Sequence, residues 1–317
     1  MAEQLATGDT SLLAELHATT SGLKVLVTTA CAQDIETARR ALGGHGFSAY
    51  AGIGRIYADY LPAATYVALP NVLYIAFSTE VSITSRFEGD NYLLDQQVVR
   101  AALKTYKRIT SSQKERNITA LLSPSTAYLR LLAKPVPPFS QDSWGNTHAC
   151  VLLLEHRALA LVRSRALHEN DADASADQRV SRAVTEAFVA EQLEGFINGL
   201  RDELPGKNAS VVRNLLHLCI LSMLESALVD LLSFALISTP SHANQDDVSL
   251  PLRKEIQRLC LALLPQAVAL SDAFGFSDWE LDSALGVYDG NVYETLWQKA
   301  QTEPLNRGDV VDGYEVG

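Results

Sequence analysis

The sequence is poor in the residues that mark disulfide-bonded, metal-binding and nucleic-acid-binding proteins. Only four cysteines occur in 317 residues, and none forms a CxxC pair, which favours buried thiols in a reducing compartment over disulfides or zinc. His148, His156 and His168 lack the i, i+3 or i, i+4 spacing of ligands on one helix face, so we predict no metal.

Acidic residues outnumber basic ones. The sequence has 26 Lys and Arg and 37 Asp and Glu, which gives a formal net charge of −11. Nucleic-acid binding needs a basic face against the phosphates, so we predict no nucleic-acid partner.

Long hydrophobic runs are absent as well. The most apolar stretch, residues 215–237, contains Glu225 and Asp230, whereas a membrane-spanning helix needs about 20 consecutive, predominantly apolar residues. The first 15 residues lack the basic start and apolar core of a signal peptide. With 47% hydrophobic and 20% charged residues, the composition is that of an ordinary globular protein. We therefore predict a soluble protein with no membrane span.

Apolar residues at helical spacing run through almost the whole chain and predict an all-α fold. The expected helices are 11–31, 34–42, 89–106, 148–167, 179–203, 209–237 and 250–271. Two short helices follow, beginning at Ser277 and Asn291, each with a glutamate three residues later as in a capping box. Residues 134–147 contain three prolines and form the predicted linker. We expect domains at 1–134 and 135–317.

Residues 67–87 are the exception to this pattern. They are rich in β-branched and aromatic residues, which is typical of a strand or hairpin. A single hairpin in an otherwise helical protein has no sheet to join. The late aromatic residues Trp279, Tyr288, Tyr293 and Trp297, by contrast, are expected to be core residues of the last domain.

Four groups of residues resemble motifs of the acyl-CoA oxidases, flavoenzymes of peroxisomal fatty-acid β-oxidation. They are residues 16–24, 42–48 and 88–91, and a C-terminal group within 272–306, in family order along the chain. Complete family members carry a helical N-terminal domain, a β-barrel domain and two C-terminal helical domains. The resemblance implies the remnant of an acyl-CoA dehydrogenase-like helical bundle at 1–134, followed by the acyl-CoA oxidase C-terminal helical bundle at 135–317.

The same resemblance implies site residues. Glu88 is the implied catalytic base, which removes the α proton of an acyl-CoA while a hydride passes to FAD. Taken without the motif, a glutamate beside a helix N-terminus is explained by the helix dipole. The implied FAD contacts, made across a homodimer interface, are Gly43, Gly44, His45, Gly46, Gly89, Asp90 and Gln97. The paired glycines alone predict only a helix C-cap and a turn.

Two functions stay open on this evidence. One is a flavin-dependent acyl-CoA oxidase represented by its C-terminal half, with a fatty acyl-CoA, O2 and a second copy of the chain as partners. The other is a non-catalytic helical fragment that dimerises but cannot hold FAD alone. An acyl-CoA dehydrogenase is less favoured, because it usually lacks the domain that residues 272–306 resemble. The family implies a peroxisomal location, otherwise a cytoplasmic one, and the chain does not end in Ser-Lys-Leu.

The strand-like segment interrupts the family pattern. Family members pass from a threonine and one aromatic residue directly into the Glu-Gly motif, whereas here the 21 residues of 67–87 lie between them. An in-frame insert of foreign composition predicts an intron retained in the coding sequence. A genuine loop insertion is the alternative, because each doubling of loop length costs only about 0.6 kcal/mol.

Overall fold

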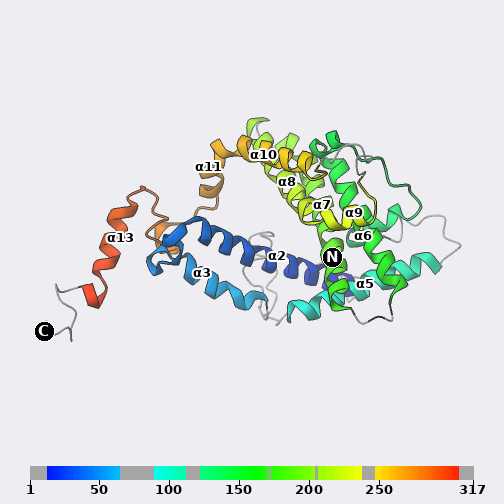
Figure 1. The fold of residues 1–317 in the computed structure, drawn as a ribbon, viewed down its shortest axis with the longest axis horizontal. Helices are drawn as coiled ribbons and strands as arrows, with labels where there is room; N and C mark the ends of the chain where they lie inside the picture. The colour runs from blue at the N-terminus through cyan, green and yellow to red at the C-terminus, as the bar shows by residue number, and fades with distance from the viewer. Residues whose placement is uncertain are drawn as a thin grey trace. The chain divides into compact units, whose positions relative to one another are not determined.

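The computed structural model describes residues 13–64, 89–111, 122–169, 171, 173–203, 206–237 and 247–306 (Figure 1). All regular elements of these ranges are helical, which confirms the all-α prediction. The α-helices are α2 (Leu13–Ala41), α3 (Ile53–Tyr60), α5 (Asn91–Ser111), α6 (Thr147–Leu167), α7 (Ala174–Glu203), α8 (Gly206–Ser226), α9 (Leu228–Ser233), α10 (Leu250–Leu263), α11 (Ala267–Asp272), α12 (Asp278–Leu281) and α13 (Val292–Gln301). Short 3-10 helices connect them, among them η1 (Gly43–Phe47), η5 (Pro124–Leu131), η6 (Gln141–Gly145) and η7 (Leu264–Gln266). The strand-like segment 67–87 lies outside the described residues.

The chain divides into two compact units, and each unit combines two separate stretches of the sequence. The first unit consists of Met1–Leu26 with Glu88–Ala267, and the second of Val27–Phe87 with Val268–Gly317. Helix α2 therefore contributes its first half to one unit and its second half to the other. The boundary expected at 134/135 stays a prediction.

The first unit is built on two clusters of buried apolar side chains. One cluster joins α6, α7, α8, α9 and α10 and includes Leu154, Ala190, Ile220, Leu231 and Leu259. The other joins α5, η5, α6 and α7 and includes Val98, Leu103, Leu129, Val162 and Ala183. Each fully buried leucine or isoleucine contributes about 1.5–3 kcal/mol relative to an exposed one. The hydrophobic effect thus holds the same α6–α7 pair from two sides.

Helix α2 approaches this core closely at Gly22. A Cβ atom at that position would lie 2.3 Å from the Thr185 hydroxyl oxygen and 3.3 Å from a methyl carbon of Val98. Glycine inside a helix costs about 1 kcal/mol relative to alanine. The close packing of α2 on α7 explains why the smallest residue stands here.

Several helix ends differ from the predicted ones. The helices expected at 11–31 and 34–42 form one continuous helix, which ends before Gly43 (φ +60°) as the glycine pair predicted. The helix expected over 209–237 stops at Ser226, and the chain turns again at Ala235 (φ 52°). The helix expected over 250–271 is interrupted by η7, where Pro265 lacks the backbone N–H that a continuing helix needs.

The two predicted capping boxes behave differently. At the start of α12, Ser277 N donates to Glu280 Oε2 at 2.8 Å and Glu280 N donates to Ser277 Oγ at 3.3 Å, so this capping box is confirmed. Asn291 precedes α13, but its side chain does not cap the helix. Its amide instead donates to Asp289 Oδ2 at 2.8 Å, which stabilises the turn before the helix.

The second unit contradicts the expectation of an aromatic core near the C-terminus. Trp279, Tyr288, Tyr293 and Trp297 are 88%, 83%, 84% and 64% exposed. The unit is held instead by polar contacts, such as Ala284 N to Tyr50 O at 2.8 Å and the ion pair of Arg55 with Asp282 at 2.7 Å. Aromatic content alone therefore did not identify a core.

The cysteines are only partly as expected. All four are free thiols, which agrees with the absence of disulfide spacing. Cys150 is buried on α6, whereas Cys219 and Cys260 are exposed, so the expectation of buried thiols fails for these two.

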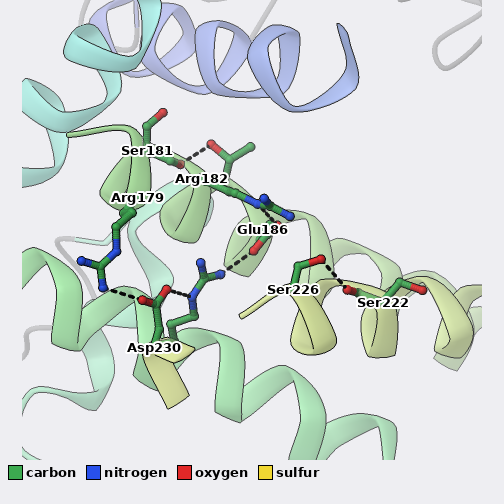
Figure 2. A network of polar contacts seen from close by, with 9 residues as sticks. Arg179, Ser181, Arg182, Glu186, Ser222, Ser226 and Asp230 are labelled. Carbon is green, nitrogen blue, oxygen red and sulfur yellow. Dashed lines mark hydrogen bonds and ion pairs between the residues drawn. The ribbon is translucent and has the colours of Figure 1, made fainter. Parts of the chain in front are cut away.

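A buried ionic network connects α6, α7 and α9 (Figure 2). Arg157, 4% exposed, donates to Glu186 and, at 2.8 Å, to Asp230 Oδ2. Glu186 is 0% exposed and also accepts from Arg182 Nε at 2.7 Å, while Asp230 Oδ1 accepts from Arg179 at 2.5 Å. Two carboxylates and one guanidinium are thus removed from water at the centre of the first unit, each with partners that satisfy it.

Candidate functional site

The start of α5 carries two of the predicted FAD contacts. Gly89 has φ +89°, a backbone conformation that favours glycine. Asp90 Oδ1 accepts from Tyr92 N at 2.9 Å, so this side chain caps the helix. Glu88, the predicted base, lies outside the described residues. The local structure therefore explains Gly89 and Asp90 as a helix start, and their contact with FAD stays a prediction.

A buried lysine holds this helix start. Lys24 on α2 is 2% exposed, and its Nζ donates to Gly89 O at 3.1 Å and to Asn91 Oδ1 at 2.7 Å. Lysine is almost never fully buried unless its ammonium is paired. Lys24 therefore fixes the backbone of the residue that directly follows Glu88. The sequence placed Lys24 in the first family motif but indicated no role for it.

We expect Lys24→Met to lower the free energy of unfolding by about 1–3 kcal/mol, because the apolar side chain leaves Gly89 O and Asn91 Oδ1 without this donor. Urea denaturation followed by circular dichroism measures the change. Lys207→Met, at an exposed position of the first unit, is the matched control and should stay within about 0.5 kcal/mol of the parent. Equal stability of the two variants would contradict a structural role of the buried ammonium.

Gln97 lies two helical turns further along α5, about 10 Å from Asp90. It lines a cleft of about 840 Å³ formed by the start of α2, the middle of α5, η5 and α7. Its side-chain amide is half-buried and has no hydrogen-bond partner among the described residues. A free amide on the wall of a cleft is able to contact a ligand there.

The four predicted residues of the glycine loop belong to the second unit. Gly43, Gly44 and His45 are exposed, and a Cβ at either glycine would meet no atom within 4 Å. Gly46 is buried, and a Cβ there would lie 1.9 Å from Arg39 O. Gly46 is thus required by packing, whereas the space beside Gly43 and Gly44 is open to a ligand.

A buried carboxyl lies on the same helix as Gln97. Asp95 is 5% exposed. Burial raises the pKa of its carboxyl to about 6; a hydrogen bond with Ser181 opposes the shift, and the carboxylates of Asp177 and Asp90 add to it. The folded state therefore holds the Asp95 proton more tightly than the unfolded chain, in which the ordinary pKa is 3.8.

This shift predicts a pH-dependent stability. The shifted pKa of Asp95 contributes to the free energy of unfolding in full below the ordinary pKa of 3.8, and this contribution is lost as the pH rises through about 6. By pH 8 the loss in the free energy of unfolding reaches up to about 3 kcal/mol. We expect Asp95→Asn to flatten the dependence and to be more stable than the parent at about pH 8. Urea midpoints between about pH 4 and 8 test this, with the exposed Asp142→Asn as control. Parallel profiles for Asp95→Asn and the parent would contradict the assignment.

Two family models match the chain. The model described as "Acyl-CoA oxidase" matches residues 148–316, and "Acyl-CoA oxidase, C-alpha1 domain" matches residues 1–78. The chain is 33% identical over 320 residues to peroxisomal acyl-coenzyme A oxidase 1 of Arabidopsis thaliana, covering 99% of this chain and 44% of the relative. It is 30% identical over 329 residues to peroxisomal acyl-coenzyme A oxidase 1 of Rattus norvegicus, covering 98% of this chain and 44% of the relative.

Solved structures give the same result. Acyl-CoA oxidase 1 of A. thaliana matches with a TM-score of 0.79 and 31% identity, over 99% of this chain and 44% of that one. Acyl-CoA oxidase-1 of Caenorhabditis elegans, crystallised with FAD and ATP, matches with a TM-score of 0.78 and 28% identity. The match covers 98% of this chain and 44% of that one. The chain spans less than half the length of the relatives that it matches.

Proposed function

Because the chain belongs to the acyl-CoA oxidase family, we propose that it supplies the C-terminal part of a FAD-dependent acyl-CoA oxidase. The reaction removes two hydrogens from a fatty acyl-CoA, giving a trans-2-enoyl-CoA, and reduces O2 to H2O2. The observation that carries the proposal is the family match at both ends of the chain, at residues 1–78 and 148–316.

In this proposal Glu88 is the base. A carboxylate can accept a carbon-bound proton that the thioester carbonyl has made acidic. Lys24 contributes as a positioning residue, because its ammonium holds Gly89 O directly after Glu88. The product carbon skeleton then carries one proton and one hydride fewer than the substrate.

The residues present fit a bound FAD in two places. The Gln97 amide, which has no hydrogen-bond partner among the described residues, lines a cleft. The open space beside Gly43 and Gly44 allows a ligand to approach the backbone. A bound FAD would supply the acceptor for the hydride and the route by which electrons reach O2. Gly46, His45, Gly89 and Asp90 complete the proposed contact set. The C. elegans structure crystallised with FAD supports this cofactor.

Assembly and location are also proposed from the family. We propose a homodimer in which the glycine loop of one copy contributes to the FAD site of the other. The relatives named peroxisomal acyl-coenzyme A oxidases support a peroxisomal location. No helix within the described residues is long and apolar enough to cross a membrane.

A second candidate is a helical module without activity of its own. The chain covers only 44% of the A. thaliana relative. The test compares the purified chain, alone and fused behind the remaining N-terminal part of that relative, for bound flavin and for H2O2 production from a fatty acyl-CoA. Flavin and peroxide in the fusion support the oxidase. A flavin-free, inactive fusion that is fully folded would leave the helical module as the function.

A further inference from the structure

The C-terminal part of α7 carries an asparagine that is followed by a glycine. Asn198 and Gly199 form the only Asn-Gly pair in the sequence, and Asn198 lies five residues before the helix ends at Glu203. Asn198 is exposed, and its side chain has no hydrogen-bond partner among the residues that the structure describes. The carbon of its side-chain amide is therefore accessible to water and to a nucleophile.

The backbone itself supplies a nucleophile. The amide nitrogen of the residue after an asparagine can attack Cγ of that asparagine, because the two atoms close a succinimide ring. A side chain on the following residue obstructs this approach, and glycine has none. In a regular helix, however, Gly199 N donates to Gly195 O, and the helical backbone holds the nitrogen away from Cγ. Ring closure therefore requires that this end of α7 opens.

Two glycines weaken α7 at this place. Gly195 and Gly199 lie one turn apart, and glycine is less favourable inside a helix than any residue except proline. A Cβ at either position would meet no atom within 4 Å apart from the backbone of the helix itself. Close packing thus does not require these two glycines, in contrast to Gly22. Since helix ends also have the lowest free energies of local opening, the Asn198 segment is placed where α7 opens most readily.

The related pair Asp289-Gly290 is exposed too, but its own contacts oppose the reaction. Asp289 Oδ1 accepts from Asn291 N at 2.9 Å, and Oδ2 accepts from Asn291 Nδ2 at 2.8 Å. These hydrogen bonds lower the pKa of the Asp289 carboxyl, and the resulting carboxylate is a poor target for a nucleophile. Gly290 N in turn donates to Val287 O at 3.1 Å. Asn198 therefore stands apart from this pair.

We propose that Asn198 is a site of spontaneous deamidation that limits the lifetime of the folded first unit. Gly199 N loses its proton and bonds to Asn198 Cγ, while the bond from Cγ to the side-chain nitrogen breaks and ammonia leaves. Water then opens the succinimide at one of its two carbonyls, which gives aspartate or isoaspartate. No electrons are transferred, and water is the only co-reactant. The inference does not rest on the proposed oxidase activity.

Both products disturb a part of α7 that packs on the core. Ile197 and Leu200, on either side of the pair, are 6% and 1% exposed. Isoaspartate leads the backbone through the side-chain methylene and so breaks the helical register between these two residues. Aspartate adds a negative charge near the C-terminal end of the helix, where the helix dipole disfavours it. The modified chain should therefore melt at a lower temperature than the parent.

Incubation of the full chain in mildly alkaline buffer, followed by peptide mapping with mass spectrometry, tests the proposal. Asn198 should deamidate faster than Asn208, an exposed asparagine in the first turn of α8 that is followed by Ala209. Gly199→Ala should lower the rate at Asn198 to that at Asn208. A rate at Asn198 no higher than at Asn208 in the parent would overturn the proposal.

Gly195→Ala tests the opening of the helix, because it leaves the Asn198-Gly199 pair chemically intact. It should slow deamidation about fivefold, which is the change in the open population that about 1 kcal/mol of helix propensity produces. The control is Gly54→Ala on α3, where a Cβ also meets no atom within 4 Å, and its rate should equal that of the parent. Equal rates in Gly195→Ala and the parent would overturn the requirement for opening. Equal melting temperatures of the incubated parent and the incubated Gly199→Ala chain would overturn the effect on the first unit.

Discussion

Glu88→Gln is expected to lower the turnover number of the reconstituted enzyme about 10²–10⁴-fold, the range that a positioned general base contributes. The enzyme for this experiment is the chain fused behind the N-terminal part of its A. thaliana relative. The amide keeps the size of the carboxylate and loses its basicity, so bound FAD and the affinity for acyl-CoA should change little. Stopped-flow reduction of the flavin by a fatty acyl-CoA measures the step directly.

The control for this variant is Glu294→Gln, at an exposed position on α13. It removes one carboxylate from the chain and should leave the rate of flavin reduction unchanged. An undiminished rate in Glu88→Gln would show that another residue takes the α proton.

Glu186→Ala is expected to lower the free energy of unfolding by about 3–5 kcal/mol. The substitution leaves the buried Arg157 guanidinium with one carboxylate in place of two, and breaking a buried ion pair from one side carries a cost of this size. Guanidinium chloride denaturation measures it. Because stabilities of native proteins are about 5–15 kcal/mol, the variant will be close to unfolding at room temperature.

The other end of the same network offers the matched control. Arg182 also pairs with Glu186, but its side chain is 52% exposed. Exposed ion pairs contribute only about 0.2–1 kcal/mol, so Arg182→Ala should be far milder than Glu186→Ala. Equal losses in the two variants would contradict the claim that desolvation of Arg157 dominates.

The helices were predictable because their signal is local. Apolar side chains recur at the helical period wherever a helix packs on a core, and Gly43 ends α2 through its own backbone freedom. The break after Ser226 and the turn at Ala235 were missed, since they lie within an apolar pattern that continues unchanged through both. The aromatic residues near the C-terminus were misplaced because apolar character does not indicate what a segment packs against.

The site was less predictable for a related reason. Lys24 contacts residues that lie 65 and 67 positions later in the chain, and no periodicity in the sequence connects them. The cleft draws its walls from four separate segments. The family resemblance predicted Gly89 and Gln97 as site residues, whereas the burial of Tyr128 depends on tertiary packing.

The placement of the cysteines makes opening of the first unit measurable by thiol chemistry. Burial raises the pKa of Cys150 to about 12, so its thiol is protonated and unreactive in the native state. Cys219 and Cys260 are exposed and should be alkylated at once, and a Cys31→Ser background removes the remaining thiol. The third and slowest alkylation is then that of Cys150. Its rate measures how often α6 separates from the core in the absence of denaturant. Glu186→Ala should accelerate that third alkylation, which would reveal transient openings that equilibrium unfolding averages away.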